Sequence, residues 1–179
     1  MAGSVCELIE RIAEELGVER VRTVTIGSSL GGWAALYFGA RVGAGHAIAG
    51  EPQTRLGSYL CGPAFHAIAE HIAGGSSPEH SRFLDAILFD ALRAAPSPPH
   101  VHLYCGRDSP YHEGHVVPLL AVLNELGVAW ELELGDSSEH GDIALHFPVY
   151  LLQRLDEVLG NAGIGSGPNQ LVSERGRGR

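Results

Sequence analysis

Several large classes of protein are excluded by what this sequence lacks. Lysine is absent from the 179 residues, and the 12 basic residues are all arginine. A formal net charge of −9 argues against a nucleic-acid groove, which needs a basic face. No apolar run is long enough to span a bilayer. Residues 1–7 lack the basic region and apolar core of a signal peptide.

Cysteine is also scarce. The three cysteines, Cys6, Cys61 and Cys105, form no spaced framework, which indicates a reducing compartment, and we expect a cytoplasmic protein. Cys105 lies within an apolar run and is interpreted as a small core residue. The length is sufficient for one domain with a substantial core.

The most informative segment is residues 27–32, with the sequence GSSLGG. It follows an apolar run typical of a strand, residues 21–26, and precedes an apolar run typical of a helix. A serine flanked two residues away on each side by glycine, at a strand-to-helix turn, is the nucleophile-elbow pattern. Side chains at Gly27 and Gly31 are expected to collide with the turn. The pattern predicts that Ser29 is a nucleophile.

Two other interpretations of this glycine-rich turn are weaker. A Rossmann fingerprint needs G-x-G-x-x-G, which the segment does not provide. A P-loop needs a lysine after its glycines, and the chain has none. A third interpretation, a turn that merely packs tightly, stays open on the segment alone.

Strands and helices are expected to alternate along the chain. The expected strands are 21–26, 46–50, 101–105 and 128–134. The expected helices are 6–16, 30–41, 64–73, 78–94, 113–126 and 141–159. This order predicts an α/β fold, a three-layer sandwich with a parallel sheet of about four strands side by side in chain order. Residues 51–63 are expected to form an irregular loop, 52–94 a helical lid-like insertion, and 160–179 a disordered tail.

The residues that would activate Ser29 are expected beyond the carboxyl ends of the later strands. Asp108 follows the third expected strand, and His140 follows the fourth. Serine, acid and histidine then occur in the chain order of an α/β-hydrolase triad. Asp136 is the alternative acid, and Asp108 could instead be a turn residue. His146 lies within a helix and is interpreted as core or helix surface.

The remaining histidines give no metal-binding pattern. His112 and His115 lack the i,i+4 spacing of a zinc-binding helix. We interpret the others as structural or surface residues: His46, His66, His71, His80, His100 and His102. No metal and no cofactor are therefore expected.

With these residues in view, the chain resembles the α/β-hydrolases from residue 21 to about residue 159. The segments 27–39, 50–53, 56–60, 140–143 and 146–148 are similar to hydrolase-like proteins of bacterial surface-glycan pathways. These proteins include capsular polysaccharide biosynthesis proteins and the glycan-modifying component of accessory secretion systems. The resemblance implies one hydrolase-like domain over 1–159, and esterase or acyl-transfer chemistry on acetylated sugars.

The chain departs from that family before the elbow. Only about twenty residues precede the elbow strand, where a full α/β-hydrolase has several strands. The Leu30 backbone N–H would supply one oxyanion donor, but a second donor has no visible source. The elbow strand would also be an exposed sheet edge. We therefore expect a fragment, one piece of a split gene product, or a minimal relative completed by a homodimer or by a missing N-terminal partner segment.

Two functions follow as hypotheses. The first is a serine-dependent ester hydrolase or acyltransferase acting on a small-molecule or glycan ester, with Ser29 as nucleophile, His140 as base and Asp108 as orienting acid. Ser28 and Arg55 are candidate substrate contacts, Arg55 as an anion anchor. The second hypothesis is a non-catalytic hydrolase-like module retained for binding or assembly.

Overall fold

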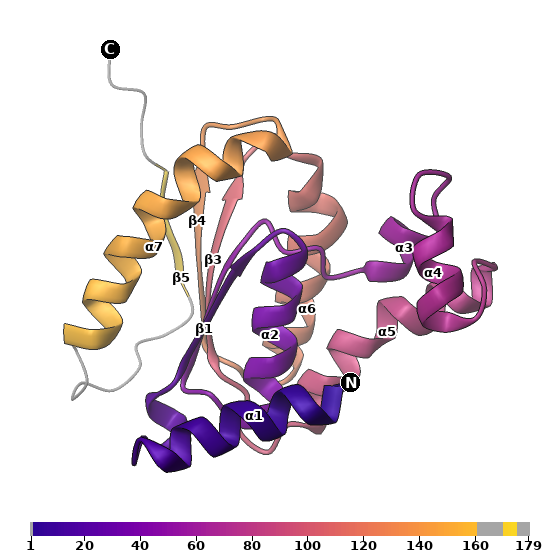
Figure 1. Cartoon of the computed structure of the whole chain (residues 1–179). Coiled ribbons are helices and arrows are strands. Elements are labelled where there is room, and N and C mark those ends of the chain that lie inside the picture. The colour runs from indigo at the N-terminus through magenta and orange to yellow at the C-terminus, as the bar shows by residue number, and fades with distance from the viewer. Residues whose placement is uncertain (1, 161–169, 175–179) are drawn as a thin grey trace.

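A computed structural model describes residues 2–160 and 170–174. Its strands form one sheet in the order β1-β2-β3-β4-β5, and every neighbouring pair is parallel. Figure 1 shows this sheet at the centre of the molecule. The strands are β1 Val24–Ser28, β2 His46–Gly50, β3 His100–Gly106, β4 Trp130–Gly135 and β5 Gln170–Glu174.

The described residues form seven α-helices. They are α1 Ala2–Glu15, α2 Leu30–Val42, α3 Leu56–Leu60, α4 His66–Ala73, α5 Pro78–Ala94, α6 Val117–Glu125 and α7 Ile143–Gly160. Short 3-10 turns lie at Arg20–Arg22 and His140–Asp142, and one π-helical turn, His112–Val116, leads into α6. None of the described helices is long and apolar enough to cross a membrane.

Side chains of the central strands alternate between two helical layers, as the pleat of a strand requires. One face of the sheet packs against α2, α5 and α6 in the main core, where Ala47, Leu103 and Leu132 are fully buried. The other face packs against α7, whose Phe147 and Tyr150 contact Ile48 and Tyr104. The predicted three-layer sandwich and the chain order of its first four strands are confirmed.

The strand that carries the elbow is at the edge of the sheet. Among the described residues, β1 pairs with β2 alone, and its Ile26 is 43% exposed. Helix α1 packs against α2 through a small cluster that contains Cys6, Val42 and Ala44. In Figure 1, α1 passes below the sheet.

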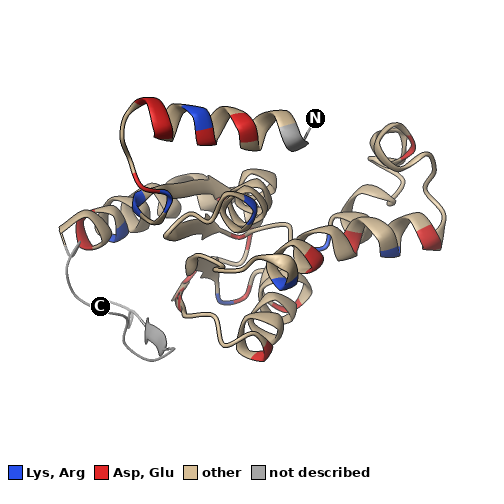
Figure 2. Cartoon of the chain, turned by 90° about the horizontal axis from the view of Figure 1, so that it is seen from below, with Lys and Arg blue, Asp and Glu red and all other residues tan. Residues whose placement is uncertain are grey.

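Helices α3, α4 and part of α5 form a separate small bundle. Its core consists of Leu56, Leu60, Ala69 and Leu84, packed against Trp33 of α2. Figures 1 and 2 show this bundle projecting from the body of the molecule, and in Figure 1 it lies on the side of the sheet where α2 and α6 are. Charged residues of both signs are scattered over the helices in Figure 2.

The elbow strand, expected at 21–26, is Val24–Ser28, because residues 20–22 form a 3-10 turn. Two further elements lie where no helix or strand was expected. Helix α3 lies inside the segment 51–63, which was expected to be irregular; its five residues are too few to show a helical period. Strand β5 lies inside the expected disordered tail and pairs with β4. Residues 161–169 and 175–179 of that tail lie outside the described residues.

Candidate active site

Ser29 occupies the sharp turn between β1 and α2. Its backbone has φ 56° and ψ −123°, a conformation that costs energy for a residue with a side chain and is typical of functional sites. A Cβ atom at Gly27 would overlap the carbonyl group of Gly31, whereas a Cβ at Gly31 would meet nothing within 4 Å. The turn therefore requires glycine at position 27. The expected collision at Gly31 is wrong.

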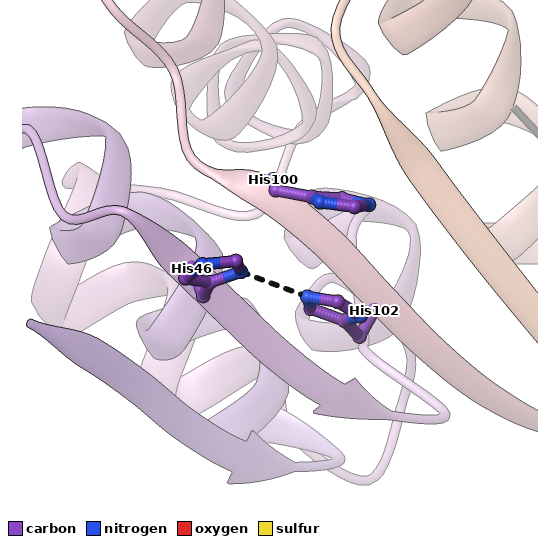
Figure 3. A group of neighbouring side chains, drawn as sticks. All are labelled: His46, His100 and His102. Carbon is purple, nitrogen blue, oxygen red and sulfur yellow. Dashed lines mark hydrogen bonds between the residues drawn. The ribbon is translucent and has the colours of Figure 1, made fainter. Parts of the chain in front are cut away.

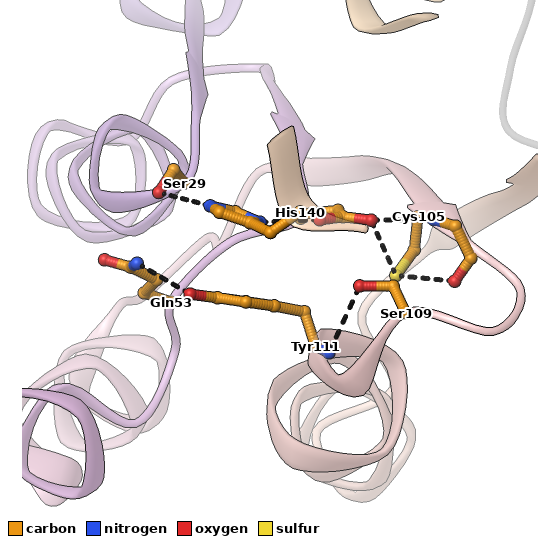
Figure 4. Close-up of polar contacts among 8 residues, drawn as sticks. Ser29, Gln53, Cys105, Ser109, Tyr111 and His140 are labelled. Atoms are coloured by element: carbon orange, nitrogen blue, oxygen red, sulfur yellow. Dashed lines mark hydrogen bonds and ion pairs between the residues drawn. The ribbon is translucent and has the colours of Figure 1, made fainter. Parts of the chain in front are cut away.

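His140 reaches the elbow from the loop that follows β4. It begins the 3-10 turn His140–Asp142, and its Nε2 lies 2.9 Å from Ser29 Oγ although the two residues are 111 positions apart in the sequence. Figure 4 shows the two side chains pointing toward one another. The structure thus brings these two predicted site residues together.

The second nitrogen of His140 contacts a glutamate. Glu51 Oε2 lies 2.6 Å from His140 Nδ1, and Glu51 is fully buried. Because a carboxylate can only accept, Nδ1 carries the proton and donates it to Glu51. Nε2 of a neutral ring is then an acceptor, so the Ser29 hydroxyl donates to it. This is the arrangement of a serine–histidine–carboxylate triad.

The carboxylate at His140 is therefore Glu51 and not Asp108. Asp108 is exposed in the turn after β3, and both ring nitrogens of His140 already have partners. Glu51 follows β2 directly, so it also stands at the carboxyl end of a strand. The rule that placed Asp108 applied equally to Glu51, but the latter had been assigned to an irregular loop. Asp136, the alternative acid, is exposed as well.

Buried donors converge on the Glu51 carboxylate. The backbone N–H of Gly106 donates to Oε1 at 2.9 Å, and the Cys105 sulfur lies 3.9 Å from the same oxygen. Burial, reinforced by the nearby carboxylate, raises the pKa of the Cys105 thiol, so it stays protonated and can donate. Glu51 also has a positive φ of 39°. Ser29 and Glu51 are the two non-glycine residues with positive φ in the part of the chain that the structure describes.

Tyr111 and Gln53 complete the surroundings of His140. The Tyr111 ring stacks on the imidazole, with ring centroids 3.8 Å apart and planes 12° apart. Gln53 Nε2 donates to the Tyr111 hydroxyl at 3.2 Å, as Figure 4 shows. Burial raises the pKa of Tyr111, which keeps that hydroxyl protonated. Sequence reasoning missed both residues, because nothing in their local pattern marks them.

The structure also places the residues that were predicted to bind the oxyanion or the substrate, namely Leu30, Ser28 and Arg55. Leu30 begins α2 directly after Ser29, which places its backbone N–H at the helix N-terminus. Ser28 is the last residue of β1. Arg55 forms an ion pair with Asp85 at 3.5 Å, and its backbone N–H donates to His115 Nδ1 at 3.1 Å. The arginine expected as an anion anchor thus has a carboxylate partner within the chain.

Similarity to known proteins is found at the level of structure. No protein-family model and no curated protein sequence matches the chain. A chain of the Glycosylation Associate Protein (Gap123) complex from Streptococcus agalactiae is similar, with a TM-score of 0.78 at 18% identity. The capsule O-acetyltransferase of Neisseria meningitidis serogroup A has a TM-score of 0.69 at 22% identity. The S-formylglutathione hydrolase of Staphylococcus aureus has a TM-score of 0.61 at 16% identity.

These similarities show the fold, which is α/β-hydrolase-like. The aligned regions cover 89%, 84% and 86% of this chain. They cover only 33%, 63% and 61% of the respective neighbours. The chain therefore spans between a third and under two thirds of the length of these solved structures.

Proposed function

We propose that this protein is a serine-dependent ester hydrolase or acyltransferase that works through an acyl-enzyme intermediate. The observation that carries the proposal is the continuous chain of contacts from Ser29 Oγ through His140 to Glu51, at 2.9 Å and 2.6 Å. A serine hydroxyl is a weak nucleophile until an adjacent base removes its proton, and that base needs an orienting partner.

The residues would act in the following order. Ser29 Oγ attacks the acyl carbon while His140 Nε2 takes the hydroxyl proton. Glu51 stabilises the imidazolium ion that results and holds the ring so that Nε2 faces Ser29. His140 then returns the proton to the leaving alcohol. Water or a second hydroxyl group, deprotonated by the same imidazole, attacks the acyl carbon and frees Ser29.

The oxyanion would be held at the N-terminus of α2. The Leu30 backbone N–H follows the nucleophile directly, and the positive end of the helix dipole favours negative charge there. Tyr111, stacked on His140, would prevent the imidazole from rotating away from Ser29. The α3–α5 bundle would serve as the lid that contacts the acyl group.

For the substrate class we propose acyl esters of sugars. Similarity to a capsule O-acetyltransferase and to a chain of a Glycosylation Associate Protein complex supports this class.

The test compares two adjacent serines. We expect Ser29→Ala to lower turnover of p-nitrophenyl acetate by about 1,000-fold or more and to abolish labelling by a fluorophosphonate, which modifies an activated serine. Ser28→Ala is the matched control: it removes only a candidate substrate contact and should retain the labelling. Circular dichroism checks that each variant folds. Absence of labelling in the wild-type chain would favour a non-catalytic binding or assembly module instead.

A further inference from the structure

Three histidines gather at the end of the sheet opposite the candidate active site. His46 is the first residue of β2, His100 is the first of β3, and His102 follows two positions later. His46 pairs in register with His100. Residues two apart on a strand point to the same face, so the three side chains share the face that α7 covers. Ser29 and His140, in contrast, lie beyond the carboxyl ends of the strands.

The imidazole rings converge closely. One possible ligand nitrogen from each of the three rings lies within 4.8 Å of the others, and His46 Nδ1 is 3.0 Å from His102 Nε2. Figure 3 shows these two nitrogens pointing at one another, with His100 stacked alongside. The centroids of His100 and His102 are 4.3 Å apart. This arrangement places three nitrogen atoms that can act as metal ligands around one point.

We propose that His46, His100 and His102 bind a divalent transition-metal ion of the zinc class. Imidazole nitrogen is a preferred ligand of zinc, nickel and copper ions. Tetrahedral zinc with Zn–N bonds of about 2.0–2.1 Å needs ligand nitrogens roughly 3.3 Å apart. Small rotations of side chains that are already this close would reach that spacing. The ion would replace the hydrogen bond between His46 and His102, since both nitrogens would then present lone pairs to the metal.

A carboxylate lies where an outer partner of such a site is expected. Glu131 Oε2 is 3.4 Å from His102 Nδ1, and Glu131 Oε1 is 3.7 Å from His100 Nε2. Metal-binding histidines usually donate their second ring N–H to a carboxylate, which orients the ring. His102 is 4% exposed, and its Nδ1 makes no well-aligned hydrogen bond in the described residues. Metal binding by Nε2 would direct this Nδ1–H to Glu131.

The charges around the histidines also suit a cation. Glu131 accepts from Arg154 at 2.6 Å, and the same guanidinium contacts Glu157 at 2.9 Å. The two carboxylates leave a net negative charge after Arg154 is counted.

The experiment uses the full chain without an affinity tag. Co²⁺, which takes tetrahedral nitrogen sites and absorbs visible light there, is titrated against wild type, His46→Gln and His100→Gln. We expect one equivalent to bind to wild type. Binding should be at least tenfold weaker in each variant, since changes outside the ligand set already cost about 10- to 100-fold in metal affinity. Added Zn²⁺ should displace Co²⁺ and remove its visible bands.

Controls separate this site from other histidines. His66→Gln and His112→Gln lie outside the cluster and should bind Co²⁺ as wild type does. If a variant folds poorly, thermal melting of wild type with and without Zn²⁺ still tests whether the metal binds, because a ligand bound to the folded state raises Tm. The proposal would be overturned if wild type showed no visible Co²⁺ band and Zn²⁺ did not change its Tm. It would also be overturned if His112→Gln abolished Co²⁺ binding while His46→Gln kept it. Neither result bears on ester turnover at Ser29.

Discussion

Backbone strain at single residues coincides with the proposed chemistry. Ser29 and Glu51 each follow a strand directly and have a positive φ. Each such conformation costs of the order of 1–3 kcal/mol and persists only where surrounding contacts determine it. The Ser29 carbonyl accepts from the backbone N–H of Gly32, Trp33 and Gln53, and the Glu51 N–H donates to Tyr104. These bonds hold the nucleophile and the acid in place before a substrate binds.

Exchanging the acid tests the identity of the carboxylate. Glu51→Gln should lower kcat for p-nitrophenyl acetate by about 10⁴-fold, because an amide holds the imidazole in the wrong tautomer. Asp108→Asn is the matched control and should leave kcat unchanged, since Asp108 is exposed and both nitrogens of His140 have other partners. Steady-state kinetics measures both. If Asp108→Asn lost activity and Glu51→Gln kept it, Asp108 would be the orienting acid instead of Glu51.

A second pair of variants tests the base. His140→Gln should reduce turnover by about 1,000-fold or more, whereas His146→Gln, exposed on α7, should keep it. Wild-type kcat/KM should also fall toward acid pH, because a protonated imidazole cannot accept the Ser29 proton. A pH–rate profile with an unchanged acid limb would contradict the role of His140, as would wild-type kinetics in the His140 variant.

At the scale of elements, the elbow depends on close backbone approach rather than on flexibility. The β1–α2 turn brings the Gly31 carbonyl against the Cα of Gly27, and the Pro52 side chain against Gly32. Helix α2 therefore packs tightly both against the strand before it and against the loop that contains Glu51 and Gln53. Displacing α2 would move the Leu30 N–H as well as Ser29.

Two substitutions test which glycine of the elbow is required for close packing. Gly27→Ala should cost about 3 kcal/mol or more of unfolding free energy, because the new methyl group overlaps the Gly31 carbonyl. Gly31→Ala has open space and should stabilise the helix by up to about 1 kcal/mol. Urea denaturation followed by circular dichroism measures both. Equal destabilisation of the two variants would show that the turn is packed differently.

At the scale of the whole molecule, an apolar edge of the sheet is exposed. Within the part of the chain that the structure describes, β1 has one strand neighbour, and its Ile26, together with Val21 before it, is exposed. Uncovered apolar edges promote association. A segment paired with β1 would also stand beside Ser29, where a second oxyanion donor is needed; one such donor is worth about 100- to 1,000-fold in rate.

We therefore expect this chain to self-associate through β1. Sedimentation velocity should show a dimer, and Ile26→Lys should shift it to monomer, because a charge on an edge strand opposes pairing. Ile68→Lys, an exposed position on α4, is the control and should leave the dimer intact. A monomer whose kcat/KM for an ester reaches the usual enzyme range of about 10⁴ M⁻¹s⁻¹ or more would contradict both the association and the need for a second donor.

Local patterns were enough to predict most of the secondary structure and the order of the strands. The period-2 and period-3.6 patterns are properties of neighbouring residues, and helix 78–94 and strand 46–50 were placed at the bounds that the structure gives. The elbow was visible because its glycines, serine, strand and helix are contiguous. His140 was found because parallel strands bring their carboxyl ends to one edge.

What the sequence could not decide was which of several residues at that edge meet. Glu51, Asp108 and Asp136 all follow strands, and only the tertiary structure selects Glu51, by burying it beside the Gly106 N–H and His140. The stacking of Tyr111 on His140 and the convergence of His46 on His102 likewise join residues 29 and 56 positions apart. Contacts of this kind depend on strand register and helix packing, which a local pattern does not contain.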